Sequence, residues 1–268
     1  MPSSVAHHPQ RIVCLTEETT ETLYLLGEEA RIVGISGFTV RPPRARKEKP
    51  KVSAFTSAKI DKILALEPDL VLGFSDLQAD IAAELIRKGI NVYVFNQRSV
   101  SEILDMMLIL GCLVGAETKA QMLIATLTAR MDAIHNKTSA PRPRVYFEEW
   151  DEPRICGIRW VSELIAIAGG EDCFSERARS PGAKGRIVAD DAEIIARQPD
   201  IIIGSWCGKR FQPEKIRVRP GWEAIPAVRN NYLYEIKSAD ILQPGPAALS
   251  DGLEQLHELI EHWRTLQS

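Results

Sequence analysis

An eleven-residue segment of this chain occurs twice. Residues 63–73 read ILALEPDLVLG, and residues 194–204 read IIARQPDIIIG, at an offset of 131 positions. Each copy predicts the end of an amphipathic helix, a Pro-Asp turn, and a short apolar strand that ends in glycine. Because this is one helix–strand step of a parallel sheet, the repeat predicts two related lobes.

Strands and helices alternate on both sides of the two copies. Apolar strand patterns lie at residues 11–15, 31–35, 70–72 and 91–95 in the first half, and at 144–147, 201–203 and 232–236 in the second. Alternation of this kind favours mainly parallel sheets covered by helices. We therefore predict an α/β protein with two Rossmann-like lobes, residues 1–115 and 141–268, and a ligand cleft between them.

The lobes are expected to be joined by a single helix. Residues 116–135 keep a helical spacing of apolar positions and contain neither proline nor glycine, and Pro141 and Pro143 follow them. This pattern predicts a long connecting helix within residues 116–140. A helical linker resists bending, so we do not expect a large hinge closure.

The composition excludes several classes of partner. A net charge of −3 at pH 7 gives no general attraction to nucleic acid. The longest apolar runs are too short to span a bilayer, so membrane insertion is not expected. The five cysteines lack CxxC spacing and the five histidines lack an HExxH motif, which predicts neither a disulfide framework nor a metal site. We expect a monomer.

The amino terminus carries a prediction about the compartment. Residues 1–10 contain neither the basic region nor the apolar stretch of a secretory signal, and residues 11–15 already have the pattern of a strand. The chain as given is therefore expected to be cytoplasmic. It would be periplasmic if a leader were missing from the sequence.

Ligands of open α/β sheets bind beyond the carboxyl ends of the strands, where loops and helix starts converge. Four of the five tryptophans lie in loops or helix starts of the second half, and large rings on loops are candidates for a broad apolar ligand wall. The alternative is that each ring fills the core of its own lobe. The candidate ligand-binding residues are Phe38, Phe74, Glu149, Trp150, Trp160, Trp206, Cys207 and Trp222.

Two strand ends carry reactive side chains. The acidic run EEWDE at residues 148–152 could do acid–base work or bind a cation, or it could be a solvated loop. Cys207 is followed by Lys209 and Arg210, which could lower the pKa of its thiol, or it could simply fill space. Phosphate-loop and GxGxxG signatures are absent from the sequence, which disfavours nucleotide enzymes of those kinds.

Several motifs follow one another in an order that resembles the substrate-binding proteins of cobalamin and iron-siderophore ABC importers, closest to the cobalamin branch. They are RIVCLT at residues 11–16, RIVGI at 31–35, LEPDLV at 66–71 and GGEDCF at 169–174. The similarity covers essentially the whole chain. It implies two α/β lobes joined by a rigid helix, a shallow aromatic cleft, no catalysis, no intrinsic cofactor, and delivery of a bound metal chelate to a membrane permease.

The resemblance also implies site residues. The ligand-facing aromatic residues of the family correspond roughly, by position, to Phe38, Phe55, Trp206 and Trp222. A corrin is a wide, apolar-faced ring fringed with amides, so it needs aromatic walls and a few polar partners. Its metal arrives already chelated, which is consistent with the absence of histidine and cysteine ligand motifs.

Family members dock on the permease through one acidic residue near the start of the helix that precedes each Pro-Asp turn. Asp61 fills this position in the first copy. The equivalent position in the second copy is Ala192, which has Asp191 and Glu193 on either side. Docking through the second lobe is therefore expected to use one of these flanking carboxylates.

We predict a non-enzymatic binding protein for cobalamin or a related corrinoid. The first alternative is a haem, siderophore or bare-metal carrier of the same fold, in which the acidic run or Cys207 contacts the metal. The second alternative is a cytosolic enzyme or chaperone that handles a corrinoid with Glu149 and Cys207.

Overall fold

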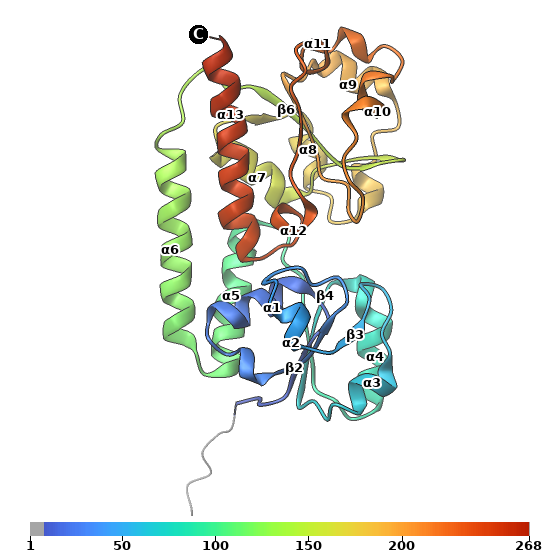
Figure 1. Cartoon of the computed structure of the whole chain (residues 1–268), viewed down its shortest axis with the longest axis vertical. Coiled ribbons are helices and arrows are strands. Elements are labelled where there is room, and N and C mark those ends of the chain that lie inside the picture. Colours follow the sequence, from blue (N-terminus) through green and yellow to red (C-terminus); the bar gives the residue numbers. More distant parts are fainter. Residues whose placement is uncertain (1–7, 268) are drawn as a thin grey trace, which may run out of the picture. The chain divides into compact units, whose positions relative to one another are not determined.

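The computed structural model describes residues 8–267 (Figure 1). The chain forms two compact units, unit 1 with Met1–Gln97 and Ser101–Thr126, and unit 2 with Arg98–Val100 and Leu127–Ser268. The helix expected at residues 116–135 is present as α6 (Glu117–His135), whose residues are shared between the units. The lobe boundaries at residues 115 and 140 stay predictions. Most of the amino-terminal segment on which the compartment prediction rests lies outside the described residues.

Unit 1 contains one five-stranded parallel sheet in the order β3-β2-β1-β4-β5. Helices α3 and α4 lie on one side of this sheet and α1 lies on the other (Figure 1). Since all five strands are parallel, their carboxyl ends meet at one edge, which we call the strand-end edge of unit 1. The elements are β1 (Ile12–Cys14), α1 (Glu17–Leu25), η1 (Glu29–Arg31), β2 (Ile32–Ser36), α2 (Ala45–Glu48), β3 (Lys51–Ser53), α3 (Ile60–Leu64), β4 (Leu70–Phe74), η2 (Asp76–Gln78), α4 (Ala79–Arg87), β5 (Val92–Phe95) and α5 (Val100–Val114).

Unit 2 contains a sheet in the order β10-β9-β6-β7, with β8 paired to β6. Only the β6–β7 pair is antiparallel among the described strands of this sheet. Helices α7 and α13 lie on one side, and α9, α10 and α11 lie on the other (Figure 1). The elements are β6 (Arg144–Asp151), β7 (Arg154–Cys156), α7 (Arg159–Ile167), β8 (Glu171–Asp172), α8 (Ser175–Ala178), η3 (Ala183–Arg186), α9 (Asp191–Arg197), β9 (Ile201–Gly204), α10 (Pro213–Arg217), η4 (Trp222–Ala224), α11 (Pro226–Arg229), β10 (Leu233–Glu235), α12 (Ser238–Ile241), the π-helix η5 (Ala248–Gly252) and α13 (Leu253–Gln267).

The repeated Pro-Asp turn has the same geometry in both units. The Asp69 carboxylate accepts hydrogen bonds from the backbone N–H groups of Gln10 and Arg11, at 2.7 and 3.0 Å, where β1 is about to begin. In the same way, Asp200 accepts from the N–H of Arg144 at the start of β6, at 2.8 Å. The repeat therefore marks a turn whose aspartate satisfies the first donors of an inner strand. The predicted fold, two α/β lobes with mainly parallel sheets, is confirmed.

Two features of the fold differ from the expectation. Residues 148–151 of the acidic run belong to β6 and not to a loop beyond it, because β6 continues to Asp151 and forms a hairpin with β7. Phe74, expected beyond a strand, is the buried last residue of β4. Within residues 8–267, no helix combines the length and the apolar composition that a membrane crossing requires.

Candidate functional site at the strand ends

The strand-end edge of unit 1 carries apolar side chains that are accessible to solvent. Phe38, in the loop after β2, is 63% exposed, and Phe55, in the loop after β3, is half-buried. Val40, in the loop after β2, and Leu77, in η2 after β4, are also exposed. Because these loops all follow parallel strands, the edge offers an apolar surface of the kind that receives a flat ligand.

The loop that carries Phe38 is anchored on two sides. On the side of α1, the backbone N–H of Val40 donates to the Glu17 carboxyl, and Arg41 Nε donates to Glu21 Oε1 at 2.9 Å. On the other side, Arg46 Nη1 donates to the carbonyls of residues 37 and 39, at 3.0 and 3.1 Å. The exposed ring of Phe38 therefore stands on a fixed backbone.

Two carboxyl groups are buried at the start of α1, and that of Glu17 is bonded to this loop. Glu17 and Glu18 form the first turn of α1, and each side chain is almost fully buried. Burial raises the pKa of Glu17 to about 8 and that of Glu18 to about 7, and the nearby charge of Glu21 adds to both shifts. The hydroxyl of Thr16 donates to Glu18 Oε1 at 2.6 Å, which partly offsets this cost.

In unit 2, the corresponding edge is built around a buried ion pair. Glu148 in β6 is fully buried and accepts two hydrogen bonds from Arg219, at 2.6 and 2.9 Å. Trp206 Nε1 and the Tyr146 hydroxyl also donate to it, at 3.0 and 3.1 Å. Burial together with the Glu148 charge raises the pKa of Tyr146 well above its ordinary value. Glu148 is therefore a structural carboxylate whose acceptor sites are occupied.

Two further acids of the run are also paired. Glu149 is bound by the buried Arg186, and Asp151 is 2.6 Å from Lys209 Nζ. No group of three or more His, Cys, Asp or Glu side chains suited to a metal ion occurs within residues 8–267. The interpretation of this run as a solvated loop is wrong for Glu148, Glu149 and Asp151, because Arg and Lys side chains of unit 2 neutralise them, whereas Glu152 is exposed.

Three of the four candidate tryptophans lie in the interior of unit 2. Trp206 and Trp222 belong to the same apolar cluster as Tyr146 and Phe211, and the buried Trp160 donates from Nε1 to the carbonyl of residue 241 at 2.9 Å. Their burial supports the core-filling alternative. Trp150 differs, since it is half-buried and its ring centre lies 3.8 Å from the ammonium of Lys209.

Cys207 does not have the electrostatic environment that its neighbours in the sequence suggested. The side chain is exposed, yet desolvation by nearby atoms and the charge of Glu149 raise the pKa of its thiol. The expectation of a lowered pKa is wrong, because desolvation and then the charge of Glu149 raise the pKa, while Lys209 is paired with Asp151.

The predicted docking carboxylates differ in their availability. Asp61, near the start of α3, is exposed, and its carboxylate forms no hydrogen bond or ion pair with the residues that the structure describes. In unit 2, Asp191 is 2.6 Å from Arg154, and Glu193 is bound by Arg177 and Arg197, at 2.5 and 2.7 Å. Docking through these residues stays a prediction.

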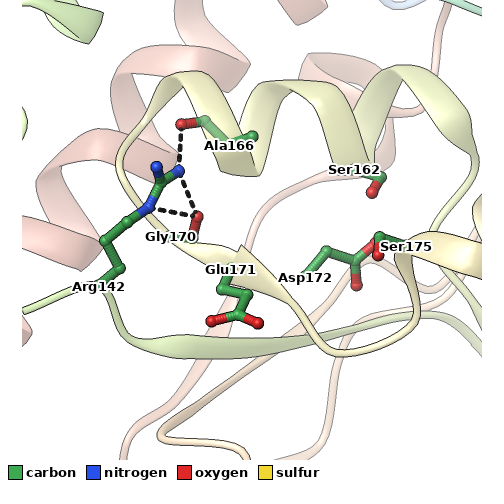
Figure 2. Close-up of a pocket in the computed structure, with 7 residues that line it drawn as sticks. All are labelled: Arg142, Ser162, Ala166, Gly170, Glu171, Asp172 and Ser175. Atoms are coloured by element: carbon green, nitrogen blue, oxygen red, sulfur yellow. Dashed lines mark hydrogen bonds between the residues drawn. The ribbon is translucent and has the colours of Figure 1, made fainter.

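A pocket of about 340 Å³ lies at the amino end of β6, away from the strand ends, and no residue pattern predicted it. Figure 2 shows Arg142 with its guanidinium turned to two backbone carbonyls, those of Ala166 and Gly170, at 2.8 Å each. Arg142 therefore caps the carboxyl end of α7. The residues that line the pocket are Arg142, Ser162, Ala166, Gly170, Glu171, Asp172 and Ser175.

Comparison with known proteins finds matches over nearly the whole chain. The model of the periplasmic binding protein family matches residues 12–239. A vitamin B12-binding protein of Vibrio campbellii is 27% identical, over 99% of this chain and 94% of its own length. An uncharacterized ABC transporter substrate-binding lipoprotein of Bacillus subtilis is 26% identical, over 96% of this chain and 82% of its own length. A crystal structure of a possible iron-binding, periplasmic solute-binding protein from Staphylococcus epidermidis is 25% identical, with a TM-score of 0.81 over 94% of this chain and 99% of that one.

These relatives correct the expected location. The matching family is one of periplasmic binding proteins. One relative, whose alignment covers 96% of this chain, is a substrate-binding lipoprotein of an ABC transporter. A location outside the cytoplasm is therefore indicated, and the prediction of a cytoplasmic protein is wrong. The residues at the amino terminus on which that prediction rested are no guide to the compartment.

Proposed function

Because the chain belongs to the family of periplasmic binding proteins, we propose that it binds a corrinoid of the cobalamin type and presents it to the permease of an ABC importer. The observation that carries this proposal is the similarity to a vitamin B12-binding protein over 99% of the chain. The proposed activity is binding without turnover. The family supports this, since its members are substrate-binding proteins.

The strand ends support a ligand with a wide apolar face and polar edges. Unit 1 offers Phe38 and Phe55 on its strand-end edge, and unit 2 offers Trp150 beside Lys209. The acidic run of β6 is neutralised by cationic side chains, which favours a ligand whose metal is already chelated over a bare ion.

An iron chelate is the second candidate cargo. The structure from Staphylococcus epidermidis is described as that of a possible iron-binding protein. Haem and ferric siderophores share with corrinoids the wide, metal-bearing core that an aromatic surface can contact. The two cargoes differ at their edges, because a corrin is fringed with amides and haem carries carboxylates.

Binding tests decide between these cargoes. We expect cyano-, aquo- or adenosylcobalamin to release heat in calorimetry with the purified protein and to change its visible spectrum on binding. Haemin and a ferric siderophore are titrated in parallel. Tight binding of haemin or the siderophore without any corrinoid binding would replace the proposed cargo, and binding of none of them would refute the carrier function.

Replacing Phe38 with alanine should weaken corrinoid binding about tenfold, because the ring contributes a flat contact from an anchored loop. Stability should stay within about 0.5 kcal/mol, since the ring is exposed in the free protein. Met122→Ala is the control, since Met122 is an exposed apolar residue on α6. Equal losses of affinity in the two variants, measured by calorimetry, would count against a ligand contact at Phe38.

A further inference from the structure

Gln78 joins the ends of three strands at the strand-end edge of unit 1. Its buried Nε2 donates to the carbonyl of Phe55, in the loop after β3, at 2.8 Å, and to the carbonyl of Leu15, beyond β1, at 3.4 Å. Its Oε1 accepts from the backbone N–H of Phe74, the last residue of β4, at 2.9 Å. One side-chain amide thus satisfies backbone groups that lie beyond the regular pairing of the sheet.

The neighbouring strand leaves room for this amide. A Cβ on Gly73 in β4 would lie 2.9 Å from Gln78 Oε1, closer than ordinary packing permits. The repeat places Gly204 at the same position in β9, and a Cβ there would meet the ring of Phe211. Unit 2 therefore fills the equivalent space with an aromatic ring, which cannot form hydrogen bonds of this kind to a loop.

The comparison shows that an apolar side chain is sufficient to fill this place in the fold. Space filling therefore does not explain why this residue is polar. The hydrogen bond from Gln78 to the loop after β3 does explain it. That bond goes to the carbonyl of Phe55, whose half-buried ring lies on the proposed ligand surface. Residues 54–57 of this loop form a turn, since the N–H of Ala54 donates to the carbonyl of Ser57 at 2.7 Å. The bond from Gln78 to the Phe55 carbonyl therefore restrains the backbone of the whole turn.

We propose that Gln78 is a positioning residue for ligand binding, which fixes the backbone of Phe55 so that its ring is held ready for a flat, metal-bearing macrocycle. The inference rests on the proposed function for the identity of the ligand. Holding the loop in its bound conformation lowers the ordering cost of binding. Gln78 itself does not touch the ligand, so its effect must pass through Phe55.

A double-mutant cycle with cyanocobalamin tests this coupling. We expect Gln78→Leu to weaken binding about tenfold and Phe55→Ala to weaken it by a similar factor. The double variant should bind within about twofold of Phe55→Ala alone, because the loop no longer has a ring to position. The control is Gln121→Leu, the same change at an exposed residue of α6, which should bind like the wild type. Losses that multiply to about a hundredfold, or an unchanged affinity in Gln78→Leu, would overturn the proposal.

A second variant and a ligand-free measurement keep the test decisive. Gly73→Ala pushes the amide aside without altering Gln78, so it should reproduce the loss of affinity if Gln78→Leu folds poorly. Amide hydrogen exchange of residues 54–57 should be faster in both variants than in the wild type without any ligand. Unchanged exchange overturns this inference alone, whereas a wild-type protein that binds no chelate overturns the proposed function.

Discussion

Replacement of Arg219 with alanine is expected to lower the free energy of unfolding by about 3–5 kcal/mol. The guanidinium supplies two of the hydrogen bonds to Glu148, a fully buried carboxylate in an inner strand of unit 2. Without it, the carboxylate keeps only the neutral donors of Trp206 and Tyr146. These bonds cannot compensate for the desolvation of a full negative charge.

Urea denaturation followed by tryptophan fluorescence measures the loss, since Trp206 bonds directly to Glu148. Glu148→Gln in the Arg219→Ala background should recover most of it, because glutamine keeps an acceptor without the charge. Arg217→Ala is the matched control, since its ion pair with Glu214 is exposed and should be worth less than about 0.5 kcal/mol. A loss below about 1 kcal/mol, or no recovery in the double variant, would show that the pair is not what stabilises this edge.

The architecture could be predicted from the sequence because its signals are local. The Pro-Asp turn works through residues that are adjacent in the chain, and both copies hold the first N–H groups of an inner strand, through Asp69 and Asp200. The apolar strands and helical spacings around them are local in the same sense. Alternation of these elements was enough to predict two α/β lobes.

The environment of the acidic run could not be predicted in this way. Glu148 and Glu149 have charged neighbours in the sequence, which suggests solvent exposure. Their ion-pair partners are instead Arg219 and Arg186, which lie 71 and 37 residues further along the chain. Ion pairs of such sequence separation form only when the whole unit has folded. The same reason hides the burial of Trp206 and Trp222, which depends on how the segments around α10 and η4 pack on the sheet.

The candidate site was predicted unevenly. The rule that ligands bind at the carboxyl ends of strands named Phe38 and Trp150, which are accessible to solvent, and Phe74, which is buried as the last residue of its strand. A ligand contact at any of them stays a prediction. It gave no indication of Gln78, because a single glutamine beside a loop carries no pattern. Glu17 and Glu18 stand at a helix start, a place that favours negative charge, yet both side chains are buried, and the Glu17 carboxyl accepts from the N–H of Val40.

The burial of these two carboxyls predicts that unit 1 becomes less stable as the pH rises from about 5 to about 9. Both groups have a pKa in the folded chain, about 8 for Glu17 and about 7 for Glu18, above the ordinary value of 4.5. Between the ordinary and the folded values, the folded state binds more protons than the unfolded state. Raising the pH through this window therefore favours unfolding. We expect a loss of roughly 2–4 kcal/mol, smaller than full linkage would give, because local opening of the loop at residues 37–41 can hydrate the charges.

Urea denaturation at several pH values between 5 and 9 measures this dependence. Glu17→Gln should raise the stability at pH 9 and flatten the slope, because the buried amide carries no proton to lose. Glu18→Gln should do the same to a smaller extent, in line with its smaller pKa shift. Glu84→Gln on α4 is the control, since this carboxylate is exposed and its removal should leave the slope as in the wild type. If Glu17→Gln and Glu84→Gln gave the same slope, the Glu17 carboxyl beneath the Phe38 loop would have to be hydrated in the folded protein. The backbone at residues 37–41 would then be mobile, which would contradict the proposal that this loop holds the Phe38 ring in place for the ligand.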